Sequence, residues 1–329
     1  MPSMKSMKTR RDFLALTGGA TASLALGAAS RAFAATEPGP FKTRLQKALI
    51  IQKPDEAVCA KLKEAGYHGM EGGVIGPQEA EKSRAAAEKF GLRIHSVIRG
   101  WAEFNSADAA KVKATFDQTV LALETARAFG ADAVLLVPCR IGGMAMPQPW
   151  DFDLEFNDKT GHLTKVVKGD NAAYADYLKA HNHAIDTSRE QVEKLIPLAE
   201  KNGVVIALEN VWNNLWVKPA HFAHFVKSFQ SPWIKAYFDI GNHVKYAPPQ
   251  DWITALGASL AKLHAKDFKI NRESKSGGEF VNIRDGDVNW PVVRQAIEKV
   301  GHNGWLTIEG GKLSMAEHSE RLDLIIAGQ

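Results

Sequence analysis

Short β-branched or apolar runs alternate with longer amphipathic stretches from Lys47 to the end of this 329-residue chain. This alternation is typical of repeated βα units. Several amphipathic stretches end in a glycine directly before the next apolar run, where a left-handed helix cap is favourable. These glycines are Gly66, Gly91, Gly130, Gly203 and Gly301. The pattern therefore predicts parallel strands joined by crossover helices.

Eight βα pairs can be counted. The predicted strands span residues 48–52, 69–74, 93–99, 131–138, 204–211, 234–240, 260–268 and 304–309. The clearest helices span residues 79–90, 109–129 and 315–327. Eight units in about 290 residues favour an α/β fold of the (β/α)8 TIM-barrel class, as a single domain over residues 35–329. A doubly wound open sheet is the alternative, although no Gly-x-Gly-x-x-Gly follows a predicted strand.

Residues 1–34 predict a targeting segment rather than part of the fold. They contain the twin-arginine pattern Thr9-Arg10-Arg11-Asp12-Phe13-Leu14, a weakly apolar stretch over residues 14–29 and the small-residue cleavage signal Ala32-Phe33-Ala34. We expect a twin-arginine signal peptide and a periplasmic or otherwise exported protein, without stable membrane insertion after cleavage. An ordinary N-terminal helix is the alternative. The sequence leaves open whether the signal is cleaved or retained as an anchor.

Net charge and cysteine content argue against nucleic-acid binding and against disulfide-rich or cysteine-rich zinc proteins. Residues 1–34 hold five basic residues and one acidic residue, so the remaining chain has 36 of each. A neutral chain lacks the basic excess that binds nucleic acid, and we expect no nucleic-acid partner. Cys59 and Cys139 are the two cysteines, which excludes a disulfide framework and a cysteine-rich zinc site.

Two connections are longer than the usual loop between a strand and a helix. Residues 141–171 follow the fourth predicted strand, and residues 269–287 follow the seventh. In a barrel both would emerge at the carboxyl ends of the strands, where active sites are built, so we expect lid or specificity loops. For the first loop, a decorative insertion or an oligomer contact is an equal alternative.

Four polar residues end the last four predicted strands. In chain order they are Glu209, Asp239, His264 and Glu309, separated by 30, 25 and 45 residues. One βα unit takes about 25 to 35 residues, and the longest interval contains the 269–287 loop. The four side chains therefore occupy equivalent positions on successive strands and are expected to converge at one mouth.

Three carboxylates and one imidazole in a half-buried mouth call for a cation between them. We therefore predict that Glu209, Asp239, His264 and Glu309 bind one divalent metal ion. Oxygen-rich ligation with one nitrogen favours Mn(II) and also admits Mg(II), Co(II), Fe(II) or Zn(II).

At this point the chain resembles a known family, the xylose-isomerase-like sugar isomerases and epimerases, whose superfamily includes the apurinic-site endonucleases. The resemblance covers nearly all of the chain after residue 34 and rests on six motifs. These are Ala65-Gly66-Tyr67-His68-Gly69-Met70-Glu71, Ala207-Leu208-Glu209-Asn210, Phe238-Asp239-Ile240-Gly241-Asn242, Leu263-His264-Ala265-Lys266-Asp267, Asp285-Gly286-Asp287-Val288-Asn289-Trp290 and Ile308-Glu309-Gly310. The Asp-x-Gly-Asn form at Asp239 is most similar to the ketose 3-epimerase branch.

The resemblance implies that the four matching residues bind one ion and that Glu209 and Glu309 act as catalytic acid and base. The ion would polarise the carbonyl of a sugar, one glutamate would remove a proton from the adjacent carbon, and the ion would stabilise the enediolate. Proton return from the opposite face gives epimerisation, and return to the neighbouring carbon gives isomerisation. Expulsion of a β-hydroxyl or alkoxide gives a lyase.

Further residues are candidate substrate contacts. Glu71 could bind a sugar hydroxyl or be a surface carboxylate, and His243 could contact substrate or simply lie in a loop. Lys266 could neutralise an oxyanion, or Asp267 could hold it in a structural ion pair. Aromatic faces for sugar C–H groups are offered by Trp101 and Trp212, for which packing is the alternative.

We therefore expect a metal-dependent isomerase or epimerase of a non-phosphorylated sugar, because kinases that make sugar phosphates need cytoplasmic ATP. A lyase or dehydratase of a keto-sugar, keto-glycoside or inosose would use the same site. A nuclease would need more metal ligands and a basic face, and a non-catalytic sugar-binding protein would lack one of the two glutamates. The partner is a small-molecule sugar, and pairing into a homo-oligomer is compatible with the family.

Overall fold

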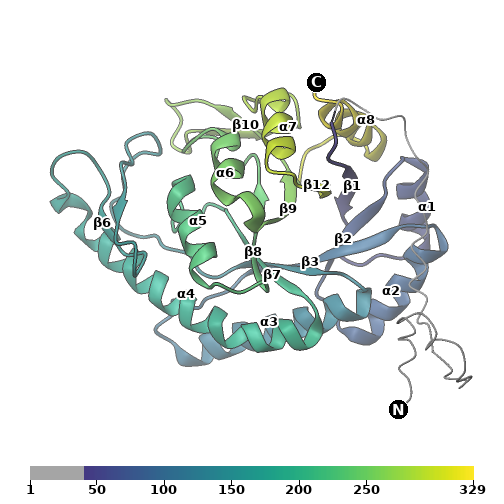
Figure 1. Ribbon diagram of the computed structural model, residues 1–329, viewed down its shortest axis with the longest axis horizontal. Coiled ribbons are helices and arrows are strands. Elements are labelled where there is room, and N and C mark those ends of the chain that lie inside the picture. The colour runs from purple at the N-terminus through teal and green to yellow at the C-terminus, as the bar shows by residue number, and fades with distance from the viewer. Residues whose placement is uncertain (1–40) are drawn as a thin grey trace, which may run out of the picture. The chain divides into compact units, whose positions relative to one another are not determined.

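The computed structural model describes residues 41–329, and these residues form one compact unit. Eight parallel strands close into a barrel in the order β1-β12-β9-β8-β7-β4-β3-β2 (Figure 1). Their bounds are β1 Leu45–Ile50, β2 Gly69–Gly73, β3 Arg93–Trp101, β4 Ala133–Val137, β7 Val205–Glu209, β8 Ile234–Asp239, β9 Leu260–Ala265 and β12 Gly304–Ile308. The prediction of a single-domain (β/α)8 barrel is confirmed. The predicted signal peptide at 1–34 lies outside the described residues.

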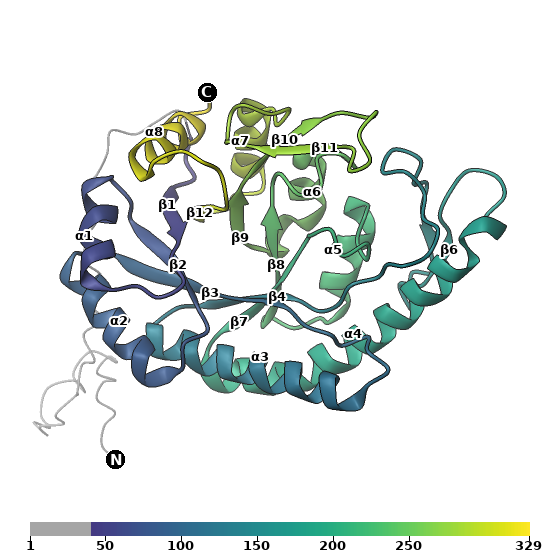
Figure 2. The ribbon, with the colours of Figure 1, turned by 180° about the vertical axis from the view of Figure 1, so that it is seen from behind.

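Helices connect the strands and lie on the outside of the barrel (Figures 1 and 2). They are α1 Glu56–Glu64, α2 Pro77–Lys89, α3 Ala109–Phe129, α4 Ala175–Asn202, α5 Pro219–Ser228, α6 Pro249–Leu256, α7 Trp290–Lys299 and α8 Met315–Ile326, with 3-10 turns η1 Ala172–Tyr174 and η2 Gly257–Ser259. Each α-helix covers the barrel with its apolar side, as parallel connections require. The predicted helix at 109–129 has the observed bounds.

The glycines that separate the repeats adopt the backbone conformation expected of them. Gly130 caps α3 with φ 71° and Gly203 caps α4 with φ 66°. Both are in the left-handed region, which a residue with a Cβ adopts at a cost. The chain thus leaves each of these helices directly toward its next strand.

Closure of the barrel depends on the first and last strands. Leu45 pairs with Gly304 and Leu49 pairs with Ile308 in parallel register. This pairing excludes the open-sheet alternative, because an open sheet would leave both strands with a free edge. It also explains why β1 begins three residues before the predicted start at residue 48. The first residues of β1 pair with β12, which lies about 260 residues later in the sequence. Local periodicity does not reveal such a distant partner.

Side chains reinforce this closure outside the barrel. The carboxylate of Glu298 on α7 accepts hydrogen bonds from the backbone N–H groups of Lys42 and Thr43, both at 2.9 Å. The buried guanidinium of Arg294 donates to Thr43 Oγ1 at 2.8 Å and to the Thr43 carbonyl at 2.9 Å. The segment that leads into β1 is therefore tied to the last third of the chain.

The two long connections each form a small antiparallel hairpin. The first contains β5 Glu155–Phe156 and β6 Leu163–Lys165, and the second contains β10 Asp267–Ile270 and β11 Gly278–Val281. The predicted seventh strand at 260–268 is therefore too long, because the barrel strand ends at Ala265 and the chain turns into β10. Both hairpins follow the carboxyl ends of their strands, β4 and β9, as expected (Figure 2). Their role as a lid stays a prediction.

The core is a single apolar cluster between the barrel and its helices, with a small second cluster inside the barrel. Cys59 and Cys139 are both buried and free. Within residues 41–329, no helix combines the length and the apolar composition needed to cross a lipid bilayer.

Candidate metal centre

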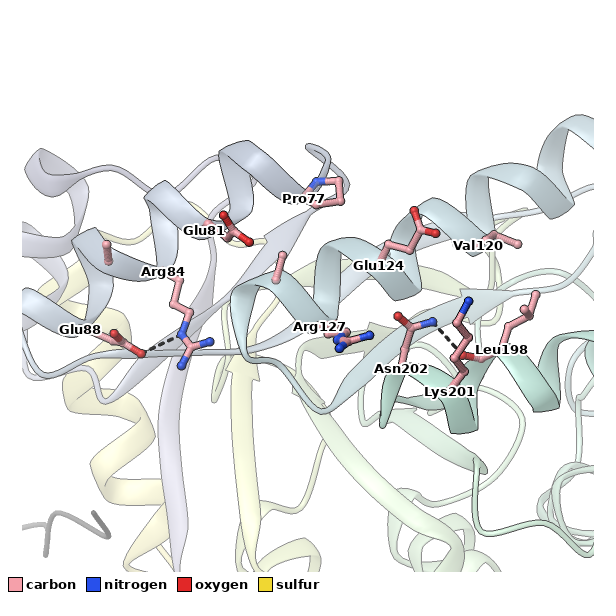
Figure 3. A pocket seen from close by; sticks show the side chains of 12 residues that line it. Pro77, Glu81, Arg84, Glu88, Val120, Glu124, Arg127, Leu198, Lys201 and Asn202 are labelled. Atoms are coloured by element: carbon pink, nitrogen blue, oxygen red, sulfur yellow. Dashed lines mark hydrogen bonds and ion pairs between the residues drawn. The ribbon is translucent and has the colours of Figure 1, made fainter. Parts of the chain in front are cut away.

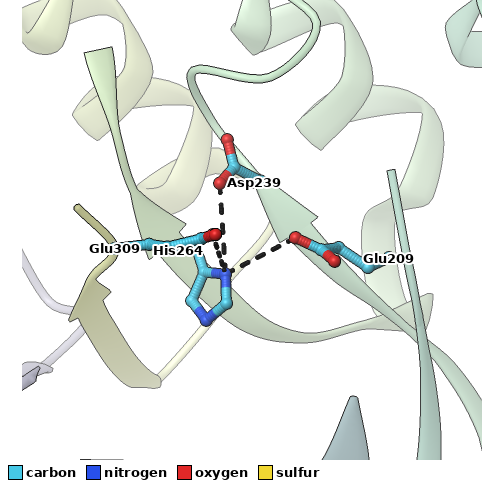
Figure 4. A group of neighbouring side chains, drawn as sticks. All are labelled: Glu209, Asp239, His264 and Glu309. Carbon is cyan, nitrogen blue, oxygen red and sulfur yellow. Dashed lines mark ion pairs between the residues drawn. The ribbon is translucent and has the colours of Figure 1, made fainter. Parts of the chain in front are cut away.

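The carboxyl ends of four neighbouring strands bring the four predicted ligands together. Glu209 and Asp239 are the last residues of β7 and β8, His264 is the fifth residue of β9, and Glu309 directly follows β12. Asp239 is in register with His264, and His264 with Thr307. One ligand atom from each of the four side chains lies within 4.8 Å of the others (Figure 4). The sequence-predicted convergence is thus observed.

The imidazole of His264 lies at the centre of the group. Its Nδ1 is 2.8 Å from Glu309 Oε2, 3.6 Å from Glu209 Oε1 and 4.0 Å from Asp239 Oδ2. Asp239 and His264 are almost fully buried, whereas the side chain of Glu309 is 30% exposed. The group is therefore open to solvent on the side of Glu309.

A buried carboxylate fixes the orientation of the imidazole. His264 Nε2 lies 2.7 Å from Glu71 Oε2, and Glu71 Oε1 accepts a hydrogen bond from Ser96 Oγ at 2.9 Å. With the Nε2 proton donated to Glu71, Nδ1 of a neutral ring presents a lone pair to the three carboxylates. A carboxylate behind a metal-binding histidine commonly sets this tautomer.

Three atoms of the group are buried and form no hydrogen bond: Asp239 Oδ2, His264 Nδ1 and Glu309 Oε2. When the ring is neutral and its proton is on Nε2, the 2.8 Å approach of His264 Nδ1 to Glu309 Oε2 places two acceptors face to face. These atoms face one another, and buried polar atoms without partners are destabilising in a protein interior. A divalent cation would satisfy all of them at once, because each offers a lone pair. The residues present therefore fit a metal ion with three oxygen donors and one nitrogen donor.

Burial and mutual charge shift the protonation of these groups. Burial raises the pKa of Glu209 and raises the pKa of Asp239 well above its usual value. Burial would also raise the pKa of Glu309, but the positive charges of His264 and Lys266 hold it below its usual range. For His264, burial lowers the pKa, and the interactions with Tyr237, Glu71 and Glu309 more than offset this and raise it. Metal binding would thus displace a proton from the centre.

Lys266 belongs to the centre as its only described ammonium group. Its Nζ lies 3.0 Å from Glu309 Oε1 and 3.8 Å from Asp239 Oδ2, and it donates to Asn242 Oδ1 at 3.3 Å. The suggested ion pair with Asp267 is wrong, because the Asp267 carboxylate accepts from Trp290 Nε1 and from backbone N–H groups that shape the β10–β11 connection. Lys266 therefore makes no ion pair with Asp267 and contacts two of the candidate ligands, Glu309 and Asp239.

Glu71 and His243, both predicted to contact substrate, are buried in the protein interior. Glu71 is completely buried, and both carboxylate oxygens already have partners. His243 is also buried, its Nε2 donates to the carbonyl of Val211 at 3.0 Å, and its ring packs on Trp252. Burial lowers the pKa of His243 to about 3. Both side chains therefore contact protein groups: Glu71 orients His264, and His243 binds the Val211 carbonyl. A sugar contact for either residue stays a prediction.

The two predicted aromatic contacts differ in exposure. Trp101 ends β3, is 40% exposed and carries the guanidinium of Arg140 at 4.1 Å from its ring centroid. Trp212 follows β7, donates its Nε1–H to the carbonyl of Asn242 and stacks on Phe280. Each lies at a carboxyl-terminal end of a barrel strand, and their contact with a sugar stays a prediction.

Two asparagines were missed as functional residues, although both stand in the quoted motifs. Asn210 and Asp239 exchange two hydrogen bonds, from Asn210 Nδ2 to the Asp239 carbonyl at 2.8 Å and from Asp239 N to Asn210 Oδ1 at 2.7 Å. The backbone N–H of Asn242 donates to Asp239 Oδ1 at 2.6 Å. They hold the aspartate in place. The Asp-x-Gly-Asn spacing was the signal, since Gly241 leaves no room for a Cβ beside Lys266.

A pocket of about 660 Å³ lies elsewhere, on the outer face between α2, α3 and the end of α4 (Figure 3). It contains none of the four ligands. Arg84 pairs with Glu88 at 2.8 Å, and Asn202 donates to the Leu198 carbonyl. Each of these two interactions joins residues of a single helix, α2 or α4.

Comparison with known proteins identifies a matching family and a related chain. Residues 59–324 match the family model described as xylose isomerase-like TIM barrel. An uncharacterized protein of Methanocaldococcus jannaschii is 24% identical over 144 residues, which are 42% of this chain. The match spans 47%, about half, of the length of that relative.

Solved structures with the same fold include sugar epimerases. A D-tagatose 3-epimerase-like protein has a TM-score of 0.64 and 18% identity, with 85% of this chain and 98% of that chain covered. The 3-keto-D-glucoside 4-epimerase from E. coli has a TM-score of 0.62 and 12% identity, with 86% and 99% covered. At these identities the likeness establishes the fold.

Proposed function

This chain belongs to the family of xylose isomerase-like TIM barrels, and on that premise we propose that it is an isomerase or epimerase of a non-phosphorylated sugar. The reaction resembles that of a ketose 3-epimerase, depends on one divalent metal ion and passes through an enediolate. Manganese is the ion that we propose first, because three oxygen donors and one nitrogen donor suit an ion of intermediate hardness.

One observation carries this proposal. Glu209 and Glu309 both reach the group of ligand atoms, but from strands β7 and β12, which two further strands separate around the barrel. Epimerisation removes a proton from one face of a carbon and returns a proton to the opposite face. This requires two acid–base groups, one on each side of the bound carbon. A metal site without two such glutamates could still bind the ion, but it would lack this pair of acid–base groups.

The residues divide the chemistry among them. A divalent ion bound by the four ligands would supply Lewis-acid polarisation of the sugar carbonyl and stabilise the enediolate. Either Glu209 or Glu309 would remove the proton next to the carbonyl, and the other would return one. Glu309 can reach a substrate, because its side chain keeps 30% exposure. Lys266 places a positive charge beside Glu309 Oε1, where it would stabilise negative charge on a substrate oxygen.

The substrate and location complete the proposal. The twin-arginine pattern at residues 9–14 supports export, which would place the enzyme away from the kinases that phosphorylate sugars. Transport of a folded chain fits a metal that is loaded before export, away from copper and zinc that bind more tightly. We therefore propose an exported enzyme that acts on a free or glycosidically linked sugar.

A lyase or dehydratase is the second candidate. The same proton removal leads to elimination when a hydroxyl or alkoxide stands β to the carbonyl. A structural neighbour named for a 3-keto-D-glucoside supports including substrates of this kind. The two candidates differ only in the fate of the enediolate, so one experiment with several substrates addresses both.

The test is proton exchange followed by NMR. The manganese-loaded protein is incubated in D2O with free ketoses, keto-glycosides and inososes, alongside Glu309→Gln, Glu209→Gln and the exposed control Glu81→Gln. Deuterium on the carbon next to the carbonyl, with a new epimer or isomer, supports the proposal if both site variants lose at least about a hundredfold in rate. An unsaturated product supports the lyase.

Metal content is measured for each variant, so that loss of the ion is distinguished from loss of the base. The reaction should also disappear after chelation and return on addition of Mn(II). Absence of exchange with every substrate, in protein shown to hold metal, would contradict the proposed function.

A further inference from the structure

An exposed aromatic ring lies beside the metal centre. Phe280 on β11 stands opposite Phe268 on β10, and the two rings pack edge to face with centroids 5.2 Å apart. Phe268 is completely buried, whereas Phe280 is 42% exposed. The ring centroid of Phe280 lies 4.7 Å from Lys266 Nζ, which in turn contacts Glu309. The exposed ring therefore adjoins the group that would bind the reacting carbons.

The ring is held in place from behind. Trp212 stacks on Phe280 with centroids 5.0 Å apart and an angle of 29° between the planes. Trp212 also packs against Phe268 and lies under Lys245 Nζ, which is 3.3 Å from its ring centroid. A rigid aromatic surface needs little ordering when a ligand arrives, which favours binding.

Contacts between separate segments fix the hairpin that carries Phe280. Lys245, which follows β8, donates to the carbonyl of Ser276 at 2.9 Å. Arg272 from the second long connection lies over the ring of Trp150 from the first, at 5.5 Å. Gly278 has φ 144°, and a Cβ there would lie 2.5 Å from the ring of Phe268. The two long connections therefore meet and form one rim on this side of the mouth.

Core packing alone does not account for this arrangement. An aromatic ring that only filled the core would be buried, as Phe268 is. Phe280 instead leaves 42% of its surface in solvent, with its centroid 4.7 Å from Lys266 Nζ, and aromatic rings beside convergent polar groups are typical of ligand sites. Sugar rings present C–H faces that pack on aromatic rings, while their hydroxyl groups stay available for polar partners.

We propose that Phe280, backed by Trp212, forms a second sugar subsite that holds a pyranose ring linked to the sugar at the metal centre. The substrate is then a keto-glycoside with two sugar rings, of which one lies at the metal ligands and the other lies on Phe280. This inference rests on the proposed function, since it assigns the reacting ring to the metal centre. It adds a substrate class that the four ligands alone do not define.

The test compares two substrates in wild type and two variants of Phe280. The 3-keto derivative of a glucose disaccharide and the 3-keto derivative of methyl glucoside are assayed with manganese-loaded wild type, Phe280→Ala and Phe280→Tyr. We expect wild type to prefer the disaccharide in kcat/KM and Phe280→Ala to lose about fivefold on it, mainly through KM, since one aromatic contact contributes about 1 kcal/mol. Phe280→Tyr should retain the preference, and the methyl glucoside should change less than twofold in either variant.

Leu121→Ala is the matched control, because Leu121 is 39% exposed but lies on α3, outside the barrel. Equal manganese affinity in all variants shows that the metal centre is intact. Equal losses on both substrates, or no loss on either, would overturn the inference without touching the proposed function.

Failure of the proposed function is recognised separately. If wild type converts neither substrate, calorimetry with the two keto-sugars measures the subsite without turnover. Tighter binding of the disaccharide that disappears in Phe280→Ala still supports the subsite. Binding that does not depend on Phe280 excludes it.

Discussion

Glu71 Oε2 lies 2.7 Å from His264 Nε2, in the interior of the barrel beneath the metal centre. The carboxylate is completely buried and its other oxygen is held by Ser96. This contact turns Nδ1 of the imidazole toward Glu209, Asp239 and Glu309. The orientation of a candidate metal ligand is thus determined by a residue outside the group of four.

Glu71→Gln should lower the affinity for Mn(II) by about 10- to 100-fold, because the amide is a weaker partner for the imidazole N–H than the carboxylate. Isothermal titration calorimetry on metal-free protein measures this change. Glu81→Gln, an exposed substitution on α2, should leave the affinity unaltered. An unchanged affinity in Glu71→Gln would mean that the imidazole is oriented by its packing alone.

Asp239→Asn should abolish stabilisation by metal while leaving the metal-free protein at least as stable as wild type. Burial already raises the pKa of Asp239 well above its usual value, so its charge is unfavourable without a cation. Wild type should gain about 2.7 kcal/mol at a Mn(II) concentration of 100 times Kd. Thermal unfolding with and without Mn(II) gives both quantities. A clear loss of stability in the metal-free variant would contradict the reasoning.

Lys266→Met should have the opposite effect on the metal-free protein. The ammonium group contacts Glu309 at 3.0 Å and Asp239 at 3.8 Å, and its removal leaves these carboxylates with His264 as their remaining positive neighbour. We expect a loss of about 3 kcal/mol at neutral pH in urea unfolding. Mn(II) should restore much of this loss, because the cation supplies the missing charge. Lys82→Met, an exposed control on α2, should show neither effect.

The carboxylate of Glu298 should make the free energy of unfolding depend on pH below about 4.5. Its pKa is lowered to about 2 by hydrogen bonds from the Thr43 hydroxyl, then from the backbone N–H groups of Thr43 and Lys42. A lowered carboxylate pKa contributes stability that is present above the unfolded value near 4.5 and is lost as pH falls toward 2.

Glu298→Gln should therefore be less stable than wild type at pH 7, and the difference should shrink between pH 4.5 and pH 2. Urea unfolding of both proteins at pH 7, 5 and 3 measures it. A difference that stays constant over this range would show that the charge of Glu298 is not involved.

The fold could be predicted because its signals are local. Apolar runs of strand length, amphipathic helices and glycines such as Gly130 and Gly203 each report on a few neighbouring residues. The four ligands could be predicted for a related reason, since equivalent positions on parallel strands meet at one end of a barrel. Spacing alone placed Glu209 and Asp239 correctly.

The depth of a side chain could not be predicted in this way. Glu71 stands near the mouth end of β2 in sequence, but a register irregularity between Met70 and Glu71 against β3 accompanies its burial beneath His264. The contact that buries it comes from β9, almost 200 residues later. Asp267 likewise looked like a partner for Lys266, yet its hydrogen bonds go to residues that follow β10. Such partners depend on tertiary packing.

The pairing of β1 with β12 has a consequence for how the protein is made. A nascent chain emerges from its N-terminus, so the strand at residues 45–50 must wait for the strand at 304–308 before the barrel can close. Glu309 directly follows that last strand, and the set of four candidate ligands is therefore incomplete until β12 has been synthesised. Binding of a divalent ion by all four candidate ligands would then require a closed barrel, and a chain that stopped before β12 would carry only three of these residues.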